Sequence, residues 1–205
     1  FMEQRRYEDL AEQLSQGGLF LYPTETIWGL GCDGFNPVAV DKVFEIKGRE
    51  QTKAVSLLVR DYYMAQNVAE ISSRAKSLIE WCWPGPLTLV LPAKENVPVQ
   101  VHGGTGFVGL RCSDHPFIQK LFHYVRTPIV TTSANRSGEP PALNFEEAKQ
   151  LDLGVEIAPW IENTGLGQPS TVIKLEGEKG WVLREGAIPK TQLLEMAKDL
   201  SIHFQ

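Results

Sequence analysis

The sequence lacks the features of a membrane-spanning or secreted protein. It has no apolar run of membrane-spanning length, and its first residues lack the basic start and apolar centre of a signal peptide. Its three cysteines, Cys32, Cys82 and Cys112, are widely spaced and odd in number. This pattern predicts free thiols in a reducing compartment rather than disulfides or a zinc site. We therefore expect a cytoplasmic protein without a membrane partner.

Several catalytic and metal-binding motifs are also missing. The four histidines show no metal-ligand spacing, and we expect no metal bound by protein side chains. There is no G-x-x-x-x-G-K-[ST] phosphate loop and no G-x-G-x-x-G after a strand. A Gly-x-Ser-x-Gly elbow is absent too, which argues against serine hydrolase chemistry. If a nucleotide binds, scattered side chains must hold it.

The net charge and the length of the chain further limit the kind of protein this can be. The net charge of −5 argues against broad electrostatic binding to nucleic acid, although it leaves room for a local basic groove. A chain of 205 residues with 42% hydrophobic residues is most simply one domain with an ample core. Phe1 precedes Met2 and is interpreted as an expression remnant, so we expect residues 2–205 to form that domain.

Helical spacing of apolar residues alternates with short apolar runs, which predicts a single α/β domain with a mixed sheet. Some connections look too short for the crossovers of a purely parallel sheet. A loop is expected over residues 23–32. The predicted helices are Glu3–Gln16, 37–47, a stretch from about Tyr63, 75–82, His115–Tyr124, Asn144–Leu151 and Thr191–Leu200. The predicted strands are Leu19–Tyr22, Ala54–Val59, Leu87–Leu91, Phe107–Arg111, Ile129–Thr131, Ser170–Leu175 and Trp181–Arg184.

Two cations flank a glycine where the second helix should end. Asn36 suits the N-cap, Pro37 suits the first helical position, and Gly48 should break the helix. Lys47 and Arg49 would then leave one exposed helix end together, as a grip for an anion such as a triphosphate. Basic residues also complement the dipole at helix ends without any ligand, and these residues alone do not separate the two interpretations.

Three polar clusters follow or end apolar strands, where α/β proteins commonly bind ligands. Thr24-Glu25-Thr26 could bind a ligand or only shape a turn. Ser133 and Asn135 should point the same way and could hold a phosphate or ribose, or only stabilise the turn. Ser170-Thr171 with Arg184 forms the third cluster, and Arg111 at a strand end belongs to the same class because a buried arginine needs an anionic partner.

These motifs, in this order, resemble the YrdC-like family, the threonylcarbamoyl-AMP synthases of tRNA modification. The likeness covers roughly Leu19 to Ile188. It is carried by Pro23-Thr24-Glu25-Thr26, Gly29-Leu30-Gly31, Phe44 to Arg49, Trp83-Pro84-Gly85-Pro86-Leu87-Thr88, Arg111, Ser133-Ala134-Asn135 with Ser137-Gly138, Ser170-Thr171-Val172-Ile173 and Val182-Leu183-Arg184-Glu185-Gly186. The pairing of Lys-x-Arg with Ser-x-Asn favours the synthase branch over its sister branch.

The resemblance implies a twisted sheet around a large concave cavity, and a reaction of L-threonine, bicarbonate and ATP. The products would be threonylcarbamoyl-adenylate and diphosphate, and a separate transferase complex would pass the threonylcarbamoyl group to tRNA. By this likeness Lys47 and Arg49 are catalytic and hold the triphosphate with Mg²⁺ carried by the nucleotide. Further ATP contacts would come from Ser133, Asn135 and Arg184, and threonine contacts from Thr24, Arg111, Thr131 and Ser170.

The sequence departs from the family pattern at several positions. Trp28 replaces the usual tyrosine, Lys53-Ala54 replaces Asn-Pro, Thr131-Thr132 precedes Ser133 where small residues and proline are usual, and Pro141 replaces a serine. These changes affect the expected threonine pocket more than the ATP half. The C-terminal domain of larger members is not expected, so a lid would come from elsewhere, such as the loop near Gly103.

Two other functions stay open from the sequence. One is a non-catalytic module that binds double-stranded RNA or tRNA, with Lys42, Lys53 and Arg60 extending a basic patch. A steep salt dependence of tRNA binding would favour it. The other is a sister-branch protein that acts on a different small acid, which calorimetry with a panel of amino acids would reveal.

Overall fold

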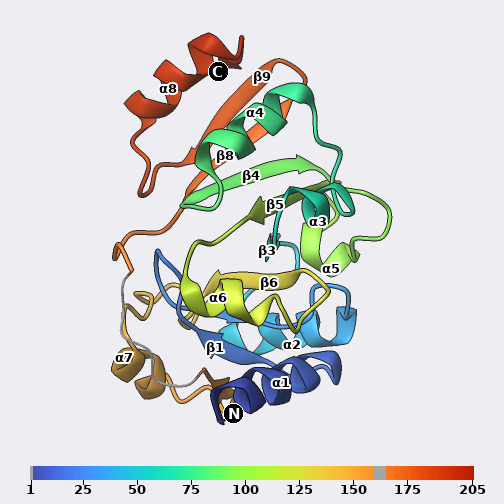
Figure 1. Cartoon of the computed structure of the whole chain (residues 1–205), viewed down its shortest axis with the longest axis vertical. Helices are drawn as coiled ribbons and strands as arrows, with labels where there is room; N and C mark the ends of the chain where they lie inside the picture. Colours follow the sequence, from blue (N-terminus) through green and yellow to red (C-terminus); the bar gives the residue numbers. More distant parts are fainter. Residues whose placement is uncertain (1, 159–164) are drawn as a thin grey trace.

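The computed structural model describes residues 2–158 and 165–205, and strands from this part of the chain form one sheet (Figure 1). The strand order is β10-β9-β8-β4-β5-β3-β6-β2-β1-β7. The strands are β1 (Phe20–Tyr22), β2 (Gly29–Gly31), β3 (Ser56–Leu58), β4 (Leu87–Pro92), β5 (Phe107–Arg111), β6 (Ile129–Ser133), β7 (Glu156–Ile157), β8 (Thr171–Glu176), β9 (Lys179–Arg184) and β10 (His203–Phe204).

Eight helices of the described residues accompany the sheet. They are α1 (Met2–Ser15), α2 (Pro37–Lys47), α3 (Tyr62–Gln66), α4 (Ser73–Cys82), α5 (Val99–His102), α6 (Pro116–Leu121), α7 (Phe145–Gln150) and α8 (Lys190–Asp199). Helices α1 and α8 lie at opposite ends of the sheet (Figure 1). Within the described ranges, no helix combines the length and apolarity needed to cross a bilayer.

The sheet is mixed, as the short connections predicted. Strands β3 and β5 pair in parallel, as do β4 and β8, whereas β6 is antiparallel to both of its neighbours, β2 and β3. Because β5 and β6 both lie beside β3, the ends of strands that are distant in sequence meet over the middle of the sheet. This α/β architecture with a mixed sheet confirms the predicted fold class.

The predicted loop over residues 23–32 is wrong in its second half, because Gly29–Gly31 form β2 and pair with both β1 and β6. Two glycines hid the strand pattern, but packing requires them. A Cβ on Gly31 would lie 2.1 Å from the carbonyl oxygen of Val130 and 2.9 Å from the Tyr22 ring. The side chain of Tyr22 fills the space beside Gly29 and Gly31, and its hydroxyl donates to Val130 O at 3.0 Å.

Helix α2 begins and ends as its sequence predicts. The Asn36 side chain accepts a hydrogen bond from the Ala39 amide, and Gly48 closes the helix with a φ of 61°. Its buried face consists of Ala39, Val40, Val43, Phe44 and Lys47. Lys47 therefore packs inward, and the expectation that both cations occupy an exposed helix end is wrong for this residue.

The short elements α5, β7 and β10 were not predicted. Strands β7 and β10 contain two residues each, and each pairs with only one neighbouring strand. Strands this short are formed by pairing with a neighbouring strand, and their own residues show too little hydrophobic pattern to predict them. The cysteines are free thiols, as expected, with Cys32 and Cys112 buried and Cys82 partly buried.

Candidate functional site

A cavity of about 240 Å³ opens where the ends of several strands converge. Three arginines line it: Arg49 follows α2, Arg111 ends β5, and Arg184 ends β9. Seven hydroxyl side chains complete most of its polar lining: Thr26, Ser56, Thr88, Thr131, Thr132, Ser133 and Ser170. A cavity with this many cations and hydroxyls suits a ligand that carries more than one anionic group.

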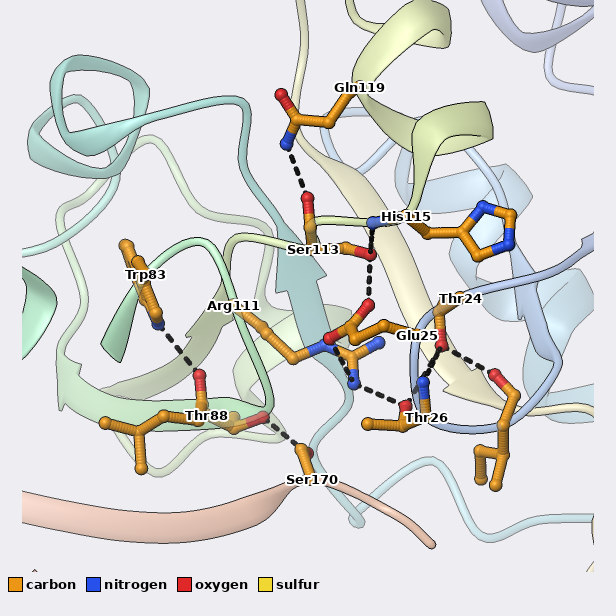
Figure 2. A network of polar contacts seen from close by, with 12 residues as sticks. Thr24, Glu25, Thr26, Trp83, Thr88, Arg111, Ser113, His115, Gln119 and Ser170 are labelled. Carbon is orange, nitrogen blue, oxygen red and sulfur yellow. Dashed lines mark hydrogen bonds and ion pairs between the residues drawn. The ribbon is translucent and has the colours of Figure 1, made fainter. Parts of the chain in front are cut away.

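Arg111 is buried and held on one side by the turn between β1 and β2 (Figure 2). Its Nη1 donates to Thr26 Oγ1 at 2.7 Å and lies 3.6 Å from Glu25 Oε1. Glu25 in turn accepts a hydrogen bond from the Ser113 hydroxyl. The guanidinium is therefore fixed by a buried ion pair and a neutral hydroxyl while it still borders the cavity.

Thr24 shapes this turn and does not line the cavity. Its hydroxyl donates to Ile27 O at 2.7 Å and accepts from the Thr26 amide at 3.2 Å. Because Thr24 uses its single proton on Ile27, Thr26 donates in the 3.0 Å contact between the two hydroxyls. Thr26, which lies in the matched motif but was given no role in binding, thus reaches the cavity where Thr24 had been expected.

Arg184, Ser170 and Thr88 form a second polar cluster on the opposite wall (Figure 2 shows Thr88 and Ser170). Arg184 donates to Ser170 O from Nε at 3.1 Å and from Nη2 at 2.8 Å, and Nη2 also donates to Ser170 Oγ at 3.1 Å. Thr88 Oγ1 lies 2.8 Å from Ser170 Oγ. The sequence placed Ser170 with Arg184, but it did not identify Thr88.

The environment of Arg184 differs from the expectation for a buried arginine. The residue is exposed overall, and none of the described carboxylates lies within ion-pair distance of it. Partial burial of the guanidinium, and then the charge of Arg111, lower the pKa of Arg184 below its usual range. Two arginines that repel each other across one cavity favour an anionic ligand between them.

Lys47 does not line the cavity, and its ammonium lies inside the turn that follows β6. It donates to Ser133 O at 2.5 Å, Asn135 O at 3.0 Å and Asn135 Oδ1 at 2.6 Å. Ser133 Oγ also donates to Asn135 Oδ1, at 2.7 Å. The structure thus brings together Lys47, Ser133 and Asn135, but only Ser133 of the three borders the cavity. Burial, then the charge of Arg49, lowers the pKa of Lys47 to about 8.

Of the two cations that flank Gly48, Arg49 is the one that borders the cavity. Nη2 donates to Ala54 O at 2.8 Å, and Nη1 makes a long contact of 3.4 Å with Thr132 Oγ1. Its Nε is buried and has no hydrogen-bond partner among the described residues. Burial lowers the pKa of this arginine from its usual range. A half-buried guanidinium with an unused donor is suited to an incoming anion.

Two further residues named from the sequence, Thr131 and Trp28, also border the cavity. Thr131 borders the cavity from β6, beside Thr132. Trp28 also contributes to its wall and packs edge-on against Phe145 at 6.0 Å between ring centroids. Within residues 2–158 and 165–205, no group of three or more metal-ligating side chains is close enough to hold an ion.

Comparisons with known proteins show which family the chain resembles. The Sua5/YciO/YrdC family model, described as "Telomere recombination", matches residues 12–186. A threonylcarbamoyl-AMP synthase of Photobacterium profundum is 34% identical over 182 residues, which are 87% of this chain and 98% of that protein.

Two solved structures extend the likeness. Pyrococcus abyssi Sua5 complexed with L-threonine superposes with a TM-score of 0.88 at 33% identity over 97% of this chain, and this chain covers 58% of that one. E. coli YciO gives a TM-score of 0.77 at 25% identity, with 90% of each chain covered. These matches confirm the resemblance read from the motifs: the chain belongs to the Sua5/YciO/YrdC family.

Proposed function

We propose that this protein is a nucleotidyltransferase that makes L-threonylcarbamoyl-AMP from L-threonine, bicarbonate and ATP, with release of diphosphate. The observation that carries the proposal is the convergence of three arginines on one cavity. An amino acid carboxylate and a triphosphate are the two anions that such a cavity would have to accommodate together. The names of the relatives and the threonine complex of the Pyrococcus abyssi protein support this choice of substrates.

In this proposal the threonine carboxylate binds Arg111, beside the Thr26 hydroxyl. Arg111 offers the forked donors that match a carboxylate, and its fixed position limits the orientations of the amino acid. Thr131 and Ser170 supply hydroxyls to the rest of threonine. Thr24 does not contact threonine directly. Its hydroxyl stabilises the turn that places Thr26 at the cavity.

The triphosphate lies against Arg49 and the Ser133 hydroxyl, with Arg184 as a further phosphate or nucleotide contact. Mg²⁺ arrives with the nucleotide. The neutral threonine amine attacks the carbon of bicarbonate, and loss of one water molecule from the adduct gives a carbamate. A carbamate oxygen then attacks the α-phosphorus as the bond to diphosphate breaks, and the electron pair of that bond leaves with diphosphate. Arg49 offsets negative charge on the leaving diphosphate, and Lys47 and Asn135 hold Ser133 in place.

The reaction is tested by diphosphate release from the purified protein with ATP and Mg²⁺. Release should require both L-threonine and bicarbonate, and the adenylate product should be detectable by mass spectrometry. The product would then serve a separate transferase that acts on tRNA. A folded protein that releases no diphosphate, or that releases it without threonine, would refute the proposed function.

Arg49→Ala is expected to reduce kcat/KM for ATP by at least about 100-fold, because it removes the cavity cation with the unused donor. The matched control is Lys53→Ala in the same turn, where an exposed lysine contacts Glu50 at 3.8 Å. Steady-state kinetics at saturating threonine should find the control unchanged. Equal losses in both variants would mean that general charge in the turn, and not Arg49, matters.

ATP binding should weaken above pH 8. The ammonium of Lys47 donates to three oxygens, and loss of its proton at a pKa of about 8 leaves two donors for three acceptors. The raised pKa values of Cys82 and Cys112, about 11, lie outside this range. Calorimetric titration with Mg-ATP from pH 7 to pH 10 should show a decline of up to about tenfold per pH unit above pH 8. A flat profile would contradict a role of the Lys47 charge.

A further inference from the structure

Glu25 is a buried carboxylate next to the cavity that does not line it. Only 8% of the residue is exposed, and its partner Arg111 is 5% exposed. A buried charge is costly unless it is paired and hydrogen-bonded, so its position calls for a structural or functional explanation. The family resemblance assigns no function to Glu25, and the proposed reaction does not use it.

The Glu25 side chain lies between Arg111 and Ser113 (Figure 2). Oε1 lies 3.6 Å from Arg111 Nη1, and Oε2 accepts from the Ser113 hydroxyl. Ser113 Oγ itself accepts from the His115 amide at 3.2 Å. The main-chain oxygen of Glu25 accepts from the Leu166 amide at 2.7 Å. The carboxylate is therefore held by two side chains, and a main-chain hydrogen bond fixes the backbone of the residue that carries it.

Those contacts constrain only one end of the Arg111 guanidinium. The ion pair with Glu25 and the hydrogen bond to Thr26 both use Nη1. Among the described residues, the side chain of Arg111 makes no other hydrogen bond, so Nη2 and Nε stay available to a ligand in the cavity. One end anchored and the other free is the arrangement that orients an arginine fork toward a carboxylate.

We propose that Glu25, held by Ser113, is the positioning residue that aims Arg111 at the carboxylate of the amino acid substrate. This inference rests on the proposed function and deepens it, since it explains how one arginine is reserved for threonine while Arg49 serves the triphosphate. Glu25 acts through Arg111 and does not touch the substrate. Because the effect is on orientation, it should appear in threonine binding and not in ATP binding.

The test compares Glu25→Ala, Glu25→Gln and Ser113→Ala with the wild-type protein, and Glu80→Ala serves as an exposed control. For Glu25→Ala, the KM of threonine should rise by about 10- to 100-fold, while the KM of ATP changes by less than about twofold. Glu25→Gln keeps the size and an acceptor for Ser113 but loses the charge that pairs with Arg111, so it should recover only part of the loss. Ser113→Ala, which keeps the charge but removes its anchor, should raise the threonine KM by about threefold or more.

The outcomes separate the inference from the proposed function. Wild-type protein without threonine-dependent diphosphate release would refute the function, and with it this role of Glu25. Active wild-type protein with an unchanged threonine KM in folded Glu25→Ala would refute the positioning role alone, as would an equal rise in both KM values or a lower threonine KM. If Glu25→Ala does not fold, Ser113→Ala decides, and an unchanged threonine KM there overturns the inference.

Discussion

Replacing Lys47 with alanine is expected to lower the free energy of unfolding by about 2–4 kcal/mol and to abolish ATP use. Only 3% of Lys47 is exposed, and its ammonium donates to three oxygens of the turn after β6. Without it, the oxygens of Ser133 and Asn135 lose a shared donor in a buried place. The cavity-facing hydroxyl of Ser133 then loses its fixed position, because its acceptor is Asn135 Oδ1.

Urea unfolding followed by tryptophan fluorescence measures the loss of stability, and diphosphate release measures activity. Lys42→Ala is the matched control, since Lys42 is exposed on the same helix. The control should stay within about 0.5 kcal/mol of the wild-type protein. A stable Lys47→Ala variant that loses only ATP binding would contradict the structural role and return Lys47 to a direct phosphate contact.

Arg111→Ala should be the most damaging of the cavity substitutions. It leaves the Glu25 carboxylate buried without its cation, which costs about 3–5 kcal/mol of stability. In the fraction that folds, kcat/KM for threonine should fall by at least about 1000-fold, because the carboxylate loses a forked, charge-assisted partner. Thermal unfolding and kinetics with threonine as the varied substrate provide the two measurements.

A double substitution separates these two effects. Removing Glu25 together with Arg111 takes away the orphaned charge, so the double variant should be more stable than Arg111→Ala alone while it stays inactive. Arg126→Ala, which removes an exposed arginine, controls for the change of charge. Additive stability losses in the double variant would show that Glu25 and Arg111 do not form an energetically coupled pair.

The sequence predicted where the secondary-structure elements around the site begin and end better than it predicted where individual side chains point. Caps and breakers such as Asn36 and Gly48 act locally, and both were found where expected. The two cations of the turn could not be distinguished in this way. Lys47 falls on the buried face of α2 and Arg49 lies beyond the glycine, so one points into the protein and the other into the cavity. Only the packing of the β6 turn against α2 decides that.

Residues that depend on contacts across the sheet were the ones missed. Glu25 was visible only as one member of a polar cluster, and nothing local indicates that Ser113, 88 positions away, binds it. Thr88 reaches Ser170 because β4 pairs with β8 in parallel. Strand β2 was missed because two glycines conceal it, and only their neighbours in the fold, the Tyr22 ring and the Val130 carbonyl, explain them. Long-range pairing, and not local propensity, places these groups.

The most direct measurement of the central claim is a crystal structure with L-threonine, Mg²⁺ and a non-hydrolysable ATP analogue. The account predicts one cavity that contains both ligands, with the threonine carboxylate on Arg111 and the triphosphate against Arg49 and Ser133. Threonine bound away from Arg111, or a nucleotide bound outside this cavity, would contradict it.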